Sequence, residues 1–227
     1  VLTLDHCHIG ESESGAKYIL LLKCTFSSIC EVIPTISTDA VPAARAIISW
    51  ITRWGLPKAI ITDGPTSFKN TLLKEITDTL RIKHHICLSY SPWTNGGIER
   101  QNREMLKIFR TILSESGTSW NFLRWPELAP LVQYCLNTTP CQTLGNISPL
   151  EVMTGRSPDT PSDLLAFTGY TFKTVETNKI SIQTITKHVE ALRKTIHEIH
   201  SKVKRSKAVK KKQNNKGRAP LTTAILH

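Results

Sequence analysis

Three acidic residues stand where an α/β sheet exposes side chains to a substrate. Asp5 is expected at the end of the first strand, Asp63 directly after an apolar strand, and Glu99 in the first turn of an amphipathic helix. Carboxylate oxygens can hold two Mg²⁺ ions roughly 3.5 to 4 Å apart, an arrangement that promotes displacement at a phosphodiester. Taken singly, such acids are more often helix caps or partners of a helix dipole. The three together, with 35 residues between Asp63 and Glu99, favour one shared metal site.

A basic stripe follows Glu99 along the same expected helix. The residues three, four, eight and eleven positions after it are Asn102, Arg103, Lys107 and Arg110, which share or border one helical face. If the chain acts on nucleic acid, these four side chains would contact its phosphates beside Glu99. The competing interpretation is a solvated face on which Glu99 and Arg103 form an ion pair.

Short β-rich runs alternate with helical stretches in the first part of the chain, which is typical of an α/β layer. Three sequential strands predict a meander, and the later strands alternate with helices. Apolar residues recur at helical spacing over 39–54 and again from Ile98 onward. The predicted strands are 1–5, 17–24, 28–34, 59–62 and 84–89, and the predicted helices are 39–54, 70–80, 98–113 and 120–137, followed by a short element at 148–158.

The positive charge of the chain is confined to its C-terminal part. Residues 1–170 hold 15 Lys/Arg and 15 Asp/Glu, whereas residues 171–227 hold 14 and 3, so the tail carries the whole net charge of +11. Basic side chains near phosphates release condensed counterions and add affinity that is independent of sequence. The charge therefore indicates nucleic acid as the partner. No apolar run reaches the roughly 20 residues of a membrane-spanning helix, so no membrane is expected as a partner. A small-molecule substrate is not expected either.

Apolar residues in this tail alternate steps of three and four, which predicts a helix with one apolar stripe. The stripe either pairs with another copy of the chain, which we favour, or folds back on the core. Beyond it, Lys204, Arg205, Lys210, Lys211 and Lys212 belong to a segment without acids that is expected to be disordered alone. These residues would bind DNA or serve as a nuclear import signal. The stripe consists of Ile182, Ile185, Val189, Leu192, Ile196, Ile199 and Val203.

The cysteines and histidines do not predict a metal centre. Six cysteines occur without any C-x-x-C pair, and the two mixed groups, 6–8 and 84–87, lack the spacing of zinc ligands. We interpret the cysteines as small buried side chains in a reducing compartment. The chain begins with Val1 in a strand-like run and is expected to be part of a longer polypeptide.

Several motifs together resemble the catalytic core of retroviral-type integrases, most closely those of gypsy-type LTR retrotransposons. The motifs are "LTLDH", "GAKYILLLKCTFS", "WGLPKAIITD", "YSPWTNGGIERQN", "LNTTP" and "SPLEVMTG", spread over residues 1–160. The resemblance implies an RNase H-like fold and an Mg²⁺-binding triad of Asp5, Asp63 and Glu99, for which Mn²⁺ can substitute. It also implies that water trims element DNA ends and that the freed 3′-hydroxyl attacks target DNA.

Two hypotheses of different class follow. The first is an active polynucleotidyl transferase that works as a homo-oligomer on element ends and target DNA in the nucleus. The second is a catalytically inactive remnant of a mobile element that binds DNA or multimerises, which is suggested by Gly64-Pro65 where the family has a later glycine. A ribonuclease H-type nuclease is a third possibility. The expected fold is α/β, a mixed five-stranded sheet flanked by helices and then a basic helical tail, with a core at 1–160, a linker at 161–180, a helix at 181–203 and a disordered tail at 204–227.

Overall fold

The structure is a computed structural model of the whole chain that describes residues 1–63, 71–87, 92–115, 121–158 and 182–216. By their internal contacts, the residues divide into two compact units, 1–137 and 138–227, which are described separately below. This division lies ahead of the boundary near residue 160 that we expected. The difference arises because the short elements after residue 138 pack against the C-terminal helix.

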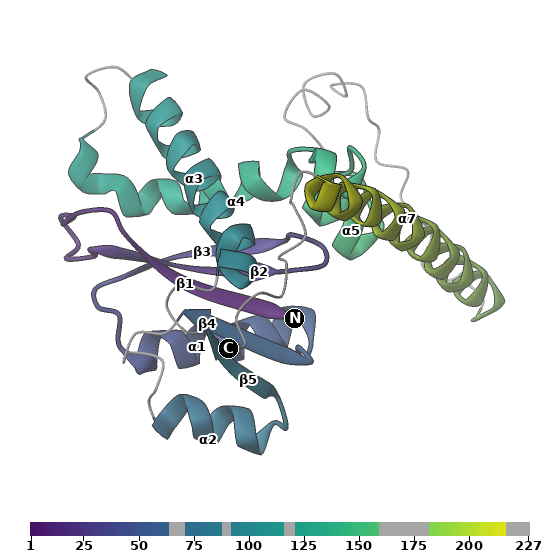
Figure 1. Cartoon of the computed structure of the whole chain (residues 1–227), viewed down its shortest axis with the longest axis horizontal. Coiled ribbons are helices and arrows are strands. Elements are labelled where there is room, and N and C mark those ends of the chain that lie inside the picture. The colour runs from purple at the N-terminus through teal and green to yellow at the C-terminus, as the bar shows by residue number, and fades with distance from the viewer. Residues whose placement is uncertain (64–70, 88–91, 116–120, 159–181, 217–227) are drawn as a thin grey trace, which may run out of the picture. The chain divides into compact units, whose positions relative to one another are not determined.

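The first unit is built on a mixed five-stranded sheet (Figure 1). Strands β1 (Leu2–His8), β2 (Tyr18–Cys24) and β3 (Cys30–Thr35) form an antiparallel meander. Strand β4 (Ala59–Asp63) runs parallel to β1, and β5 (Lys83–Cys87) runs parallel to β4, so the order is β3-β2-β1-β4-β5. Parallel neighbours need crossover connections, which the helices between these strands provide. The expected mixed five-stranded sheet is confirmed.

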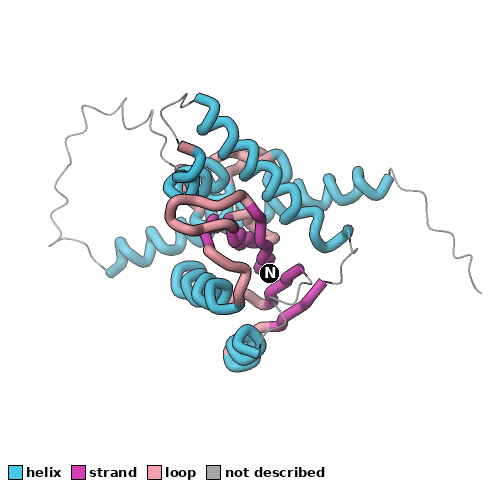
Figure 2. The backbone as a smooth tube through the Cα atoms, turned by 90° about the vertical axis from the view of Figure 1, so that its left-hand side faces the viewer, coloured by secondary structure: helices cyan, strands magenta, loops and turns pink. Residues whose placement is uncertain are grey.

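Helices cover both faces of this sheet, as Figures 1 and 2 show. Helices α1 (Ala40–Trp54) and α2 (Thr71–Thr79) lie on one face, and α3 (Pro92–Glu115) and α4 (Trp125–Thr138) lie on the other. A short 3-10 turn, η3 (Phe122–Arg124), leads into α4. None of the helices in the described ranges is long and apolar enough to cross a membrane.

Strand β2 contributes side chains to the core on both faces. Ile19 and Leu21 belong to the buried cluster that α3 and α4 complete, whereas Leu20 and Leu22 point to the opposite face. All four are 0% exposed. Because full burial of one such side chain stabilises a fold by about 1.5 to 3 kcal/mol, this strand is a central source of stability.

Helix α3 starts earlier than the sequence pattern predicted. We expected a polar, glycine-rich link up to Gly97, but the helix begins at Pro92. Proline is favoured at the first position of a helix, because the N–H that it lacks has no partner there. Glu99 consequently lies in the third helical turn rather than in the first. For Trp93 the sequence favours packing under the neighbouring helix over stacking on a base, and its side chain lies outside the described part of the chain.

The outer edge of the sheet is β3, and side chains from α4 pair with its outward-facing backbone groups. Asn137 accepts a hydrogen bond from Cys30 N–H at 2.9 Å and donates one to Cys30 C=O at 2.8 Å. Gln133 accepts from Val32 N–H at 2.8 Å, and Pro34 has no N–H to offer. An exposed edge strand invites pairing with another chain, so these contacts protect the sheet against aggregation.

The second unit contains η4 (Gln142–Leu144), α5 (Pro149–Thr154) and α7 (Ile182–Lys216). Helix α5 begins with a Ser148 side chain that accepts a hydrogen bond from Glu151 N–H and ends at Gly155 in the left-handed region. Helix α7 passes close to that glycine, since a Cβ there would lie 2.6 Å from Cγ1 of Ile196. The two helices therefore pack closely, with no room for a side chain at position 155.

The apolar stripe of α7 is divided between a packed part and an exposed part. Val203 is 0% exposed and Ile196 and Ile199 are half-buried, whereas Val189 and Leu192 are exposed at 42% and 43%. The packed part contacts α5 and η4 within the unit. For those residues the structure supports the fold-back interpretation, whereas pairing of α7 with another chain stays a prediction.

Helix α7 also extends beyond its predicted end. We expected the helix to stop at Val203 and the following residues to be disordered, but it continues to Lys216. Lysine, arginine, glutamine and alanine favour helix, and the first strong breaker after Val203 is Gly217. The basic residues from Lys204 to Lys212 are thus displayed on a helix. The end of the predicted tail, 217–227, lies outside the described residues.

Candidate metal and nucleic-acid site

Asp5 lies in the middle of β1 rather than at its end, because the strand continues to His8. It is half-buried, and in the register of the sheet it stands opposite Leu21 of β2. That register places it on the face covered by α3 and α4. A carboxylate is therefore held at the centre of the sheet, next to a helix.

Helix α3 contacts this carboxylate through an amide. Asn102 Nδ2 donates a hydrogen bond to Asp5 Oδ2 across 2.6 Å. The bond joins residues 97 positions apart in the sequence. Because Glu99 precedes Asn102 by one turn, the same contact brings the turn that carries Glu99 against β1.

Side chains on α3 form two stripes with different surroundings. Ile98, Met105 and Phe109 are buried against the sheet, whereas Arg103, Lys107 and Arg110 are exposed. Glu99 is exposed as well and stands at the N-terminal end of the basic stripe, bordering the buried one. The helix therefore presents an acid near the sheet and a row of cations leading away from it.

Asp63 is the last residue of β4, and its backbone lies near that of Asp5. The parallel register pairs Leu4 with Thr62, so Asp5 and Asp63 are the next residues on two neighbouring strands. The side chain of Asp63 is outside the described part, as are Gly64 and Pro65. The structure thus places Asp5 and the backbone of Asp63 on neighbouring strands, and Glu99 three residues before the asparagine that bonds Asp5.

Burial shifts the pKa values of two histidines and one cysteine of the sheet so that their neutral forms are favoured. Burial lowers the pKa of His6 to about 4. Burial, and after it the negative charge of Asp5, raises the pKa of Cys7. On β5, burial followed by the charge of His85 lowers the pKa of His84, whose ring nitrogen Nε2 lies 3.0 Å from Thr62 Oγ1. His6 is therefore neutral near pH 7 and adds no positive charge beside Asp5.

Among the described side chains, no three His, Cys, Asp or Glu residues gather into a group that could hold a metal ion. The side chain of Asp63 is not described, so this absence does not extend to the predicted triad as a whole.

The remaining predicted DNA ligands lie on α7 in the second unit. Lys204, Arg205, Lys211 and Lys212 are exposed and Lys210 is half-buried. All five belong to the continuous helix α7, and part of the apolar stripe of this helix packs against α5 and η4. The cationic side chains are therefore accessible to a polyanion.

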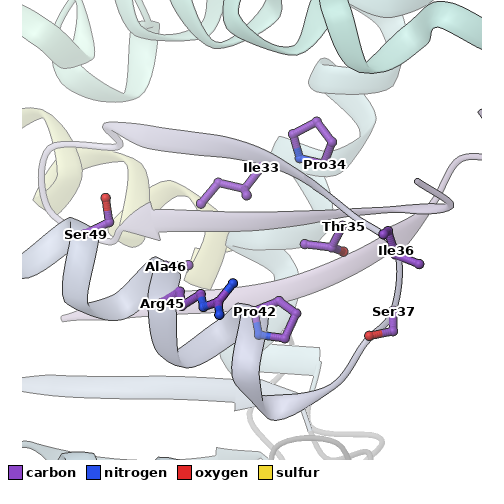
Figure 3. A pocket seen from close by; sticks show the side chains of 9 residues that line it. All are labelled: Ile33, Pro34, Thr35, Ile36, Ser37, Pro42, Arg45, Ala46 and Ser49. Atoms are coloured by element: carbon purple, nitrogen blue, oxygen red, sulfur yellow. The ribbon is translucent and has the colours of Figure 1, made fainter. Parts of the chain in front are cut away.

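A cavity of about 560 Å³ lies between β3 and α1 (Figure 3). Its walls are formed by Ile33 and Thr35 of the edge strand and by Pro42, Arg45 and Ser49 of the helix. None of the three candidate acids lines this cavity. It is therefore separate from the candidate site.

Sequence reasoning missed the partner of Asp5. We assigned Asn102 to DNA phosphates, yet its amide nitrogen bonds a carboxylate in the protein. A signal was present, because Asn102 continues the spacing of Ile98, Met105 and Phe109, the stripe that faces the sheet. The pairing of Asn137 and Gln133 with the edge strand was missed as well.

The relatives of this chain are Pol polyproteins of retroelements. The chain is 30% identical over 154 residues to the retrovirus-related Pol polyprotein from transposon 412 of Drosophila melanogaster, covering 67% of the chain and 12% of that protein. It is 27% identical over 156 residues to the Gag-Pol polyprotein of feline leukemia virus, covering 68% of the chain and 9% of that protein. No family model matches the chain. The chain thus spans only a small part of the length of these relatives.

Solved structures share the fold. The magnesium complex of the HTLV-2 integrase catalytic core domain superposes with a TM-score of 0.54 at 16% identity, covering 67% of the chain and 94% of that domain. The intasome of simian T-cell lymphotropic virus matches with a TM-score of 0.59 at 17% identity, covering 70% of the chain and 55% of that chain. The resemblance stated from the motifs and the RNase H-like fold class are confirmed.

Proposed function

We propose that this chain, a retroviral-type integrase catalytic core by its fold and its relatives, is a metal-dependent polynucleotidyl transferase that joins retroelement DNA to target DNA. One observation carries the proposal. The hydrogen bond from Asn102 to Asp5 holds the turn of Glu99 against β1, beside the strand that ends in Asp63. This arrangement supports a shared site for the three acids, which are distant in the sequence.

The proposed reaction has two steps of the same kind. A water oxygen first attacks a phosphodiester near the element end, and the bond from phosphorus to the 3′-oxygen breaks. The freed 3′-hydroxyl then attacks a target phosphodiester, and the target 3′-oxygen leaves. In each step the attacking oxygen loses a proton and the leaving oxygen gains one, so no covalent bond to the protein is needed.

Asp5, Asp63 and Glu99 are the residues that would hold the metal. Their donors are hard carboxylate oxygens, which suit Mg²⁺ and also Mn²⁺. The local structure fits this role, since Asp5 is half-buried and oriented by an amide whose own oxygen, Asn102 Oδ1, is buried without a donor among the described residues. When bound, two Mg²⁺ ions would activate the attacking oxygen and stabilise charge on the leaving one.

The DNA contacts are proposed on two elements. Arg103, Lys107 and Arg110 would hold phosphates close to the acids, because they continue the line of Glu99 on α3. The basic residues of α7 would add affinity that falls with salt. Element ends and target DNA as substrates, assembly as a homo-oligomer and action in the nucleus are parts of this proposal.

The test is strand transfer with a short pre-trimmed duplex and supercoiled plasmid, in Mg²⁺ and then in Mn²⁺. Glu99→Gln should keep the fold and lower joining at least about a thousandfold, roughly 4 kcal/mol in barrier. Glu104→Gln is the matched control, since Glu104 is exposed on another face of the same helix. A branched disintegration substrate is included because it requires less of the protein.

A second candidate function is that of an inactive DNA-binding remnant, which the long basic helix α7 favours. In that case neither substrate reacts with the folded chain, whereas salt-sensitive DNA binding persists and does not change with Glu99→Gln. Pro65→Gly would then be the next variant. Recovery of joining by that change would assign the loss of activity to the turn after Asp63.

A further inference from the structure

Position 102 belongs to the buried stripe of α3, and this stripe is otherwise apolar. Ile98, Met105 and Phe109 are 5%, 0% and 4% exposed, and they stand four positions before, three after and seven after Asn102. That spacing puts all four side chains on the side of the helix that faces the sheet. An amide therefore occupies a place where an apolar side chain would be the ordinary choice.

Burying an amide lowers stability unless both of its ends find partners. Among the described residues Asn102 satisfies only one end of its amide, through the 2.6 Å bond from Nδ2 to Asp5 Oδ2. Its oxygen Oδ1 is buried and meets no hydrogen-bond donor within the described part of the chain. The amide nitrogen thus bonds a carboxylate, and the amide oxygen can accept a hydrogen bond from a donor that the described residues do not supply.

We propose that Asn102 is a positioning residue of the metal site. Its amide N–H fixes the orientation of the Asp5 carboxylate, and its buried oxygen accepts a hydrogen bond from water that accompanies a bound divalent cation. This inference rests on the proposed function, because it takes Asp5 to be a metal ligand. Groups that orient metal-binding carboxylates through hydrogen bonds commonly change metal affinity 10- to 100-fold when removed.

This role replaces the phosphate contact that the sequence suggested for Asn102. Arg103, the next residue, is exposed at the head of the basic stripe, whereas Asn102 is turned toward β1. Neighbouring positions on one helix thus face different partners, a carboxylate for one and DNA for the other. The two roles can be separated by experiment, because they affect different ligands.

The experiment uses the full chain and measures Mn²⁺ binding by calorimetry without DNA, together with duplex binding in metal-free buffer by fluorescence anisotropy. Asn102→Leu should weaken Mn²⁺ binding at least about tenfold while leaving duplex affinity within about twofold of wild type. Arg103→Ala should do the reverse. Urea unfolding without metal should show no lower midpoint for Asn102→Leu, since leucine suits the apolar stripe.

The proposal is overturned if Asn102→Leu retains wild-type Mn²⁺ affinity, or if it weakens duplex binding as much as Arg103→Ala does. Should the leucine variant fail to fold, Asn102→Ala is measured in the same way with the same expected outcomes. Asp5→Asn separates this inference from the function on which it rests. Loss of Mn²⁺ binding in Asp5→Asn with retention in Asn102→Leu overturns only the positioning role, whereas retention in Asp5→Asn overturns the metal site itself.

Discussion

Two asparagines on the same face of the sheet, the buried Asn137 and the half-buried Asn102, differ in their hydrogen bonding. Asn137 of α4 meets the edge strand with both ends of its amide, accepting from Cys30 N–H and donating to Cys30 C=O. Among the described residues Asn102 of α3 uses one end of its amide only, donating to Asp5 at the centre of the sheet. Both asparagines stand on a helix that packs against strands, yet within this described part Asn137 pairs both ends of its amide and Asn102 does not.

The difference separates a structural polar group from one kept for a ligand. A fully paired amide protects backbone groups that would otherwise be exposed to water or to another strand. A half-paired amide beside a carboxylate lowers the stability of the fold and is retained only if something else uses it. The completeness of the hydrogen bonding among the described residues, rather than residue type, distinguishes the two positions.

The largest effect on stability is expected from Asn137→Ala. The change leaves the N–H and C=O of Cys30 without partners, and each such buried group lowers stability by about 1 to 3 kcal/mol. We expect the free energy of unfolding to fall by roughly 2 to 4 kcal/mol, measured by urea denaturation. Leu131→Ala is the control, because Leu131 is exposed on the same helix. A loss no greater than that of Asn102→Ala would remove the contrast between the asparagines.

A smaller loss is expected from Gln133→Ala, because a single hydrogen bond to Val32 N–H is removed. The expected fall is about 1 to 2 kcal/mol. In the double variant with Asn137→Ala the edge strand would be open to pairing, so sedimentation velocity should show self-association that neither wild type nor the Leu131→Ala control displays. A double variant that stays monomeric would show that other features protect the edge.

Asn102→Asp converts the half-paired position into a second carboxylate beside Asp5. Two like charges in hydrogen-bonding contact raise the pKa of the pair, so the folded chain binds protons more tightly than the unfolded chain. Stability should therefore be highest at low pH and fall by about 1 to 2 kcal/mol as the pH rises through the raised pKa. Mg²⁺ should restore the melting temperature near pH 7. A pH profile parallel to that of wild type would contradict the proximity of the two side chains in solution.

The smallest effect near neutral pH is expected at His6, which shares β1 with Asp5 but points to the other face. Burial lowers its pKa from 6.5 to about 4, so the folded chain holds fewer protons than the unfolded chain between these values. The stability contributed by His6 is present above pH 6.5 and is lost as the pH falls toward 4. His6→Gln should lessen this decline in urea unfolding. An unchanged decline would show that His6 does not contribute, and its direction is opposite to that expected for Asn102→Asp.

The sequence predicted the order and type of the elements well, because the apolar periods of strands and helices are local. The meander, the helix over 40–54 and the strand before Asp63 agree with the structure within a few residues. The extents of α3 and α7 were wrong, because helix continues through polar and basic residues wherever no strong breaker stops it. The apolar stripe of α7 was ambiguous for a similar reason, since its spacing does not say which surface will cover it.

The sequence by itself predicted the α/β class and singled out the three candidate acids. It also showed that the net positive charge is confined to the tail. Residue type and spacing along one strand or helix carry these properties. Only the tertiary structure decided which distant residues meet. It placed Asn102 against Asp5, Asn137 against Cys30 and Gly155 against Ile196. These contacts depend on the register of β1 and on the packing of α3, α4 and α7, which hold together residues that lie tens of positions apart.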